Sequence, residues 1–267
     1  MNILMIGAHP DDCEVFGGGT AALFSQSGHR VKFISTTNGD AGHHLLRGHE
    51  LEARRSKETI EAAQVLGVEY EVMANHDGQL IVSLENRHAI IQKIREWQAD
   101  IVVTHRPNDY HPDHRYTSQI VQDAAYMVMV PNIVSQVAPL RKNPVFMYFQ
   151  DSFKKPYPFT PGLAFNISST YEAKIKALHA HDSQFYEWLP WIDGEIDQVP
   201  ESTDDRIDWL KQIFSASPTK DVRKLLASLY GEEQAKAIKQ AEAFEISEYG
   251  HQPDKEEIQA ILGAVGH

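Results

Sequence analysis

The chain has 267 residues, of which 42% are hydrophobic and 23% charged, so it is long enough for one large globular domain or one domain with an appendage. Its formal net charge of −12 argues against a general nucleic-acid or anionic-membrane surface, because both need clustered positive charge. The single cysteine, Cys13, excludes intramolecular disulfides and cysteine-rich zinc modules, so we expect any metal site to use nitrogen and oxygen ligands.

The N-terminal segment MNILMIGAHPDD has no basic region ahead of a long apolar stretch, and it reads as a buried strand rather than a signal peptide. No run of 18 or more apolar residues is present, so we predict no transmembrane helix. We therefore expect a cytoplasmic protein with no membrane and no nucleic-acid partner.

Short apolar runs alternate with longer amphipathic ones over the first 150 residues. The predicted strands are residues 2–7, 31–36, 69–73, 100–104 and 145–149, and the predicted helices are residues 18–27, 48–66, 84–98 and 116–129. This alternation predicts an α/β fold with a mainly parallel sheet and helices on both faces. Right-handed crossovers make it a Rossmann-like, doubly wound sheet, and in the common strand order 3-2-1-4-5 the first and fourth strands are neighbours.

The pattern changes beyond about residue 151. A proline-rich connector, KKPYPFTPG, is followed by a short predicted strand at residues 165–167 and a predicted helix at 171–181. From about residue 202 the sequence reads as mostly helical, including EEQAKAIKQAEAFEI at residues 232–246. We predict a first domain over residues 1–190 and a helical C-terminal extension over residues 191–267 that packs on it.

Two polar clusters follow the first and fourth predicted strands, as AHPDDCE and HPDHR. The carboxyl ends of neighbouring parallel strands meet at one edge of a sheet, where ligands bind in open α/β folds. A single His or Asp after a strand is usually a turn residue, but two such clusters at equivalent strand ends are not explained by capping. The residues that we expect to meet there are His9, Asp11, Asp12, His111, Asp113 and His114.

The residue types of the two clusters indicate a catalytic metal site. His9, Asp12 and His114 supply two imidazoles and one carboxylate, which leaves coordination positions open, as catalytic zinc requires. Zinc lowers the pKa of bound water toward about 7, and Asp11 would be placed beside that water as a general base. His111 would stabilise an oxyanion or protonate the leaving amine.

Glycines 17 to 19 are predicted to permit a tight turn and close packing of a helix on the sheet rather than to bind phosphate. The sequence has neither G-x-G-x-x-G nor the P-loop pattern, so it does not support a dinucleotide- or nucleotide-phosphate site of these kinds.

At both motifs the sequence resembles the PIG-L/LmbE-like family of N-acetylglucosaminyl deacetylases. The family patterns A-H-P-D-D-x-E and H-P-D-H stand here as residues 8–14 and 111–114. RRSKETIEAAQVLGV is similar to the family's R-x-x-E helix, and HDSQ to its later H-x-S-Q element; the likeness covers about residues 1–190. Two departures, Cys13 and the neutral Asn166, bear on substrate identity rather than on hydrolysis.

The resemblance implies the same metal ligands and the same base, and it adds further roles. Asp113 would orient the imidazole of His111, and Arg55 and Asp77 would contact substrate, although Arg54 leaves the register of the arginine open. The ion would be Zn²⁺, with Fe²⁺ or another divalent ion as the alternative. Relatives that assemble as trimers or hexamers imply a homo-oligomer.

The sequence therefore predicts a metal-dependent hydrolase that removes an acetyl group from the amide nitrogen of an N-acetylglucosamine-type sugar or sugar conjugate. Two alternatives remain open at this point. A non-catalytic sugar- or nucleotide-binding module could retain the metal, and a non-haem iron oxygenase also uses two histidines and one carboxylate. Which N-acyl sugar is the substrate is not encoded in a recognisable pattern.

Overall fold

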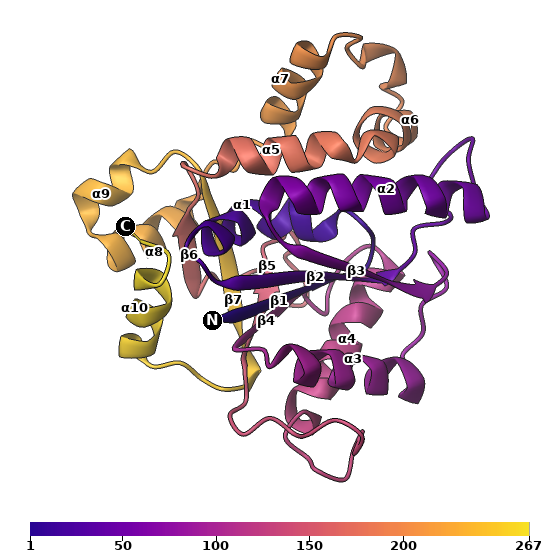
Figure 1. The fold of residues 1–267 in the computed structure, drawn as a ribbon. Helices are drawn as coiled ribbons and strands as arrows, with labels where there is room; N and C mark the ends of the chain where they lie inside the picture. The colour runs from indigo at the N-terminus through magenta and orange to yellow at the C-terminus, as the bar shows by residue number, and fades with distance from the viewer. Residues whose placement is uncertain (267) are drawn as a thin grey trace.

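A seven-stranded, mainly parallel sheet forms the centre of the molecule (Figure 1). The computed structural model describes residues 1–266. The strand order is β3-β2-β1-β4-β5-β7-β6, so the predicted order of the first five strands is confirmed. The strands are β1 (Asn2–Gly7), β2 (Arg30–Thr37), β3 (Glu69–Asn75), β4 (Ile101–Thr104), β5 (Val145–Phe149), β6 (Leu163–Asn166) and β7 (Ala241–Gly250).

Helices cover both faces of this sheet, as predicted (Figure 1). Side chains of β1 alternate between the two layers: Ile3 and Met5 belong to one core cluster, and Leu4 and Ile6 to the other. A strand that is apolar on both faces needs cover on both. On one face lie α1 (Asp12–Gln26), α2 (Gly48–Leu66) and α5 (Tyr171–Ala180), and on the other α3 (Leu84–Trp97) and α4 (Pro112–Met127).

Two helices begin earlier than predicted, and both carry site residues in their first turns. α1 begins at Asp12 rather than near residue 18, because the glycines that read as a turn lie inside the helix. A Cβ at Gly17 would lie 2.8 Å from Met5 Sδ, and one at Gly19 would lie 2.6 Å from Ile167 Cδ1, so the predicted close packing is confirmed and the predicted turn is wrong. α4 begins at Pro112, a residue that suits the first turn of a helix.

The C-terminal extension is not purely helical, which corrects the prediction for residues 241–246. These residues belong to β7, which runs antiparallel between β5 and β6. Their alanine- and glutamate-rich composition favours a helix locally, but pairing on both sides satisfies the backbone as a strand. The buried Glu242 accepts hydrogen bonds from Gly19 N and Thr20 N and pairs with Lys174 at 2.6 Å, which allows a charge in a central strand.

The remaining helices pack around this sheet at its β6 side and over α5 (Figure 1). They are η1 (Gln184–Trp188), α6 (Leu189–Ile192), η2 (Ile196–Gln198), α7 (Thr203–Ile213), α8 (Lys220–Tyr230), α9 (Glu232–Ala237) and α10 (Lys255–Gly263). None of the helices within residues 1–266 has the length and apolar character needed to cross a membrane. The domain boundary at residue 190 stays a prediction, although β7 joins residues 241–250 to the main sheet.

Candidate metal and catalytic site

The two polar clusters meet where β1 and β4 end. The strands pair in parallel, with Ile6 beside Thr104, so the turn that follows β1 and the segment that follows β4 leave the sheet at the same edge. The loop after β3 brings Asp77 to the same place, with Asp77 Oδ1 3.2 Å from His9 Nε2. Three segments that are distant in sequence therefore build one site.

Donor atoms of the three predicted metal ligands lie close together at this edge, with Asp12 facing one histidine through each of its two oxygens. His9 Nδ1 lies 3.2 Å from His114 Nε2, which lies 3.4 Å from Asp12 Oδ1, and Asp12 Oδ2 lies 3.6 Å from His9 Nδ1. Two ligands of a tetrahedral zinc ion at about 2.0–2.1 Å are separated by about 3.3–3.4 Å. Three groups at this edge could each hold a metal ion: His9, His111 and His114; His9, Asp77, His111 and Asp113; and Asp12, His105 and His114. Each predicted ligand belongs to at least one group, but no group contains all three, so the set His9, Asp12 and His114 stays a prediction.

Asp12 is fixed and kept ionised by its surroundings. Its Oδ2 accepts hydrogen bonds from Ala8 N at 2.9 Å and His9 N at 2.7 Å, and it lies 3.1 Å from His105 Nε2. Burial would raise the pKa of Asp12, but His114 and His105 outweigh it and hold the pKa well below its usual value. The carboxylate is therefore available as an anionic ligand.

His105 is a site residue that the sequence analysis missed. Its ring stacks on that of His114, with centroids 4.1 Å apart and planes 10° from parallel, and the residue is buried. The only signal in the sequence was its position directly after the fourth strand, in THRPND, which lacks the spacing of the two motifs.

Carboxylates also stand behind both imidazoles. His9 Nε2 faces Asp113 Oδ2 at 3.3 Å as well as Asp77, and His114 Nδ1 lies 3.1 Å from Asp109 Oδ1. The last contact is an ion pair without a hydrogen bond, because His114 Nδ1 has no hydrogen-bond partner. Burial lowers the pKa of each imidazole, but these carboxylates and Asp12 outweigh it and raise both pKa values. Such partners orient metal-binding histidines and increase their basicity.

The structure places Asp113 differently from the role that the resemblance implied. Its carboxylate faces His9 and accepts hydrogen bonds from Gly78 N at 2.7 Å and Leu80 N at 3.3 Å. The contact with His111 comes from the backbone, because Asp113 N donates to His111 Nδ1 at 3.2 Å. His111 thus caps α4, and its ring lies edge-on to that of His9 with centroids 4.5 Å apart.

Asp11 and the buried Arg55 form a partly buried ion pair beside these residues. Asp11 precedes α1 with φ 151° and ψ −26°, a strained conformation for a residue with a side chain. Arg55 Nη2 donates to Asp11 Oδ2 at 3.1 Å and to Pro10 O at 2.8 Å. Burial raises the pKa of Asp11 to about 6, and Arg55 limits the rise.

Arg55, not Arg54, is the arginine that faces the site. Arg55 is 1% exposed, whereas Arg54 points to Glu187 and Asp182 at 2.6 and 3.1 Å. Because the Arg55 guanidinium is committed to Asp11 and to backbone oxygens, its direct contact with substrate stays a prediction, as does that of Asp77.

The R-x-x-E helix and the HDSQ segment, which also resemble the family, contact each other and α1 next to this edge. Glu14 is fully buried and lies 2.9 Å from His181 Nε2, and Glu58 accepts hydrogen bonds from Ser183 N and Oγ at 2.9 and 2.7 Å. Polar contacts therefore join the HDSQ segment to the R-x-x-E helix through Glu58 and to the first turn of α1 through Glu14.

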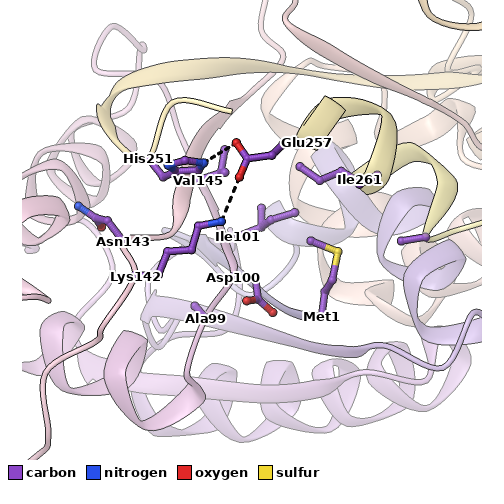
Figure 2. A pocket seen from close by; sticks show the side chains of 12 residues that line it. Met1, Ala99, Asp100, Ile101, Lys142, Asn143, Val145, His251, Glu257 and Ile261 are labelled. Carbon is purple, nitrogen blue, oxygen red and sulfur yellow. Dashed lines mark hydrogen bonds and ion pairs between the residues drawn. The ribbon is translucent and has the colours of Figure 1, made fainter. Parts of the chain in front are cut away.

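Two cavities lie at opposite edges of the sheet. One, of about 440 Å³, includes Asp109 and Tyr110 and thus adjoins the metal-ligand cluster. The other, of about 390 Å³, is lined by the starts of β1, β4 and β5 and by α10 (Figure 2). Ligands of open parallel sheets bind at the carboxyl ends of strands, so the first cavity is the one related to the chemistry.

Comparison with known proteins supports the same assignment. The profile of the family described as PIG-L: GlcNAc-PI de-N-acetylase matches residues 4–125. The chain is 31% identical to diacetylchitobiose deacetylase of Thermococcus kodakarensis over 206 residues, which cover 71% of this chain and 74% of the relative. It is 24% identical to a probable N-acetyl-alpha-D-glucosaminyl L-malate deacetylase 2 of Bacillus cereus, over 79% of this chain and 94% of that one.

A solved structure agrees in fold. The N,N'-diacetylchitobiose deacetylase of Pyrococcus horikoshii superimposes with a TM-score of 0.68 at 26% identity, covering 92% of this chain and 83% of the other. Sequence identity over most of the chain, the shared fold and the two intact motifs lead to the same conclusion: the protein belongs to the PIG-L/LmbE-like family of deacetylases.

Proposed function

We propose that this protein is a metal-dependent hydrolase that removes the acetyl group from the amide nitrogen of an N-acetylglucosamine-type sugar or sugar conjugate. The observation that carries the proposal is that donor atoms of His9, Asp12 and His114 lie 3.2–3.6 Å apart in pairs, next to the partly buried Asp11. The named relatives deacetylate sugars of this class, which supports the choice of substrate.

His9, Asp12 and His114 would hold the ion, and we propose zinc, with Fe²⁺ as the alternative that the same ligands accept. Bound there, a zinc ion would act as a Lewis acid and lower the pKa of water to about 7. A binding protein would need only the ligands, whereas this site also holds a strained Asp11, which belongs to none of the groups that could hold a metal ion.

Asp11 would act as the general base. A pKa of about 6 leaves its carboxylate mainly ionised at neutral pH and still basic enough to accept a proton from the attacking water. Arg55 fixes one carboxylate oxygen, Oδ2, which leaves Oδ1 to receive that proton.

His111 would stabilise the reacting carbonyl group or protonate the leaving nitrogen. Its Nδ1 accepts a hydrogen bond from Asp113 N, so the neutral ring carries its hydrogen on Nε2. Burial and the neighbouring His9 and His114 lower the pKa of His111, which favours this neutral form. In the complete reaction the amide C–N bond breaks, the water oxygen leaves in acetate, and the proton accepted by Asp11 ends on the released amine.

The test is the variant Asp11→Asn in the zinc-loaded protein. We expect zinc content to stay at the wild-type level while deacetylation of N-acetylglucosamine and its glycosides falls by about 10²–10⁴-fold. Asp221→Asn, on the exposed face of α8, is the matched control. Wild-type rates for Asp11→Asn would contradict the base assignment, and acetate release that requires oxygen would favour the oxygenase alternative.

Assembly into a trimer or hexamer stays a prediction. A measurement of molecular mass in solution would test it.

A further inference from the structure

The cavity of about 390 Å³ lies at the edge of the sheet opposite the proposed metal site (Figure 2). Its walls come from the starts of β1, β4 and β5, from the segment before β5 and from α10. Small-molecule sites typically have volumes of about 300–1,000 Å³, so this cavity is large enough to hold a ligand. None of the residues predicted for metal binding or catalysis lines it, so the proposed deacetylase function does not account for it.

The interior of this cavity is mainly aliphatic. Ile101 and Val145 of the sheet line it together with Ile261 of α10, and all three are buried. The apolar lining residues are Met1, Ala99, Ile101, Val145, Ala260, Ile261 and Ala264. An apolar ligand that displaces water from such a surface gains free energy. The walls therefore favour a ligand with a hydrocarbon body over a sugar.

The basic side chains at the rim already have a carboxylate partner. Glu257 lies between them, with Oε1 3.1 Å from Lys142 Nζ and Oε2 2.6 Å from His251 Nε2 (Figure 2). The hydrogen bond from His251, and then that from Lys142, lower the pKa of Glu257 to about 2, so its carboxylate is ionised at neutral pH. An anionic ligand would have to compete with Glu257 for both groups.

Asp100 is a carboxylate of the lining that has no cationic partner. Its Oδ2 accepts a hydrogen bond from Asn2 N at 2.8 Å, and no cation within residues 1–266 forms an ion pair with it. Met1 lies in the same wall, but its ammonium group is 2.9 Å from His29 Nδ1 (Figure 2). In a chain with a net charge of −12, an unpaired carboxylate attracts a cation.

A second acceptor in the lining also lacks a donor. Asn143 Oδ1 is buried and has no hydrogen-bond partner among the described residues. A buried carbonyl oxygen without a donor costs free energy unless a water or a ligand supplies one. Asp100 Oδ1 is likewise without a donor, so a ligand that complements this cavity carries N–H groups. An ammonium group has three such donors and a positive charge.

We propose that this cavity binds a small organic cation, whose apolar body fills the aliphatic interior and whose ammonium group donates to Asp100. The site is separate from the proposed metal centre, and the inference does not depend on the deacetylase function. An apolar carboxylate held by Lys142 is the competing outcome.

The experiment is isothermal titration calorimetry of the zinc-loaded full chain with four compounds at neutral pH. 2-Phenylethylamine has both the apolar body and the ammonium group. 2-Phenylethanol and 3-phenylpropanoate replace the ammonium by a neutral and an anionic group, and methylamine lacks the body. We expect 2-phenylethylamine to bind about 3–10-fold more tightly than 2-phenylethanol, the range of a charge-assisted contact at a partly exposed site, and methylamine not to saturate.

Two variants test whether binding occurs in this cavity. Asp100→Asn keeps an oxygen that can accept from Asn2 N but removes the charge, so the preference for the amine over the alcohol should fall toward 1. Ala260→Phe introduces a ring into the cavity from an exposed position on α10 and should abolish the binding of both compounds. The matched controls are Asp221→Asn on α8 and Gln259→Phe, an exposed neighbour that does not line the cavity, and both should bind as the wild type does.

Three results would overturn the proposal. The first is no saturable binding of 2-phenylethylamine, and the second is binding that persists in Ala260→Phe. The third is tighter binding of 3-phenylpropanoate that Lys142→Ala weakens, which would assign the cavity to an anion. None of them bears on the proposed deacetylase function, because its test measures zinc content and acetate release at the other edge of the sheet.

Discussion

Replacing Asp109 with asparagine tests whether the carboxylate behind His114 tunes the metal site. The substitution keeps the size of the side chain. Its amide oxygen can still accept the hydrogen bond that His111 N donates to Asp109 Oδ1 at 2.9 Å in the structure. What it removes is the negative charge 3.1 Å from His114 Nδ1, in a place where both side chains are 6% exposed.

The expected size of the effect follows from the role of such carboxylates. Loss of one outer-shell partner typically costs about 10–100-fold in metal affinity, or about 1.4–2.7 kcal/mol. Asp109 also contributes to the raised pKa of His114, although burial opposes that rise. In the variant, protons compete less strongly with zinc for His114, which offsets part of the lost zinc affinity at low pH. The loss of zinc affinity should therefore be larger at pH 8 than at pH 6.

The assay is competition for zinc between the metal-free protein and a chelating dye at both pH values. Asp221→Asn, whose side chain is 71% exposed on α8, serves as the control for loss of one carboxylate. A folded Asp109→Asn protein with wild-type zinc affinity at pH 8 would refute the argument, because the carboxylate would then have no influence on the metal ligand.

Three further predictions concern charge and burial. Arg55→Gln removes the cation that limits the pKa of Asp11, and the pKa of this carboxyl group should then rise above about 6. The acidic limb of the pH profile of kcat/KM should move to higher pH. An unchanged limb would contradict the role of the Asp11–Arg55 pair. The carboxylates around His9 outweigh burial and raise the pKa of its imidazole, so zinc must displace a proton from His9 when it binds. The affinity of the protein for zinc should therefore fall as the pH is lowered from 8 to 6. A chelator titration that gives the same zinc affinity at both pH values would contradict this prediction. Lys174→Met leaves Glu242 buried without a cation and should lower the free energy of unfolding in urea by about 3–5 kcal/mol, part of which Glu242→Gln in the same chain should restore; an unchanged midpoint would rule out this contribution.

The parallel part of the fold and the place of the candidate site could be predicted from the sequence. Apolar runs that are buried on both faces and separated by amphipathic helices have few packing solutions, so the order of the first five strands could be predicted. The motifs at the ends of β1 and β4 then had to meet, because neighbouring parallel strands end at one edge. Both signals are local in sequence and need no knowledge of distant contacts.

Features that depend on partners distant in sequence could be recognised only in the folded molecule. The segment that forms β7 reads as a helix because its residues favour one, and β5 and β6 on either side turn it into a strand. His105 and Asp109 lie in no recognisable spacing, and their contacts with Asp12 and His114 exist only once the loops are folded. Arg54 and Arg55 are identical residues side by side on α2, so the sequence alone does not show which of them reaches the site. The packing of α2 places Arg55 beside Asp11 and Arg54 beside Asp182.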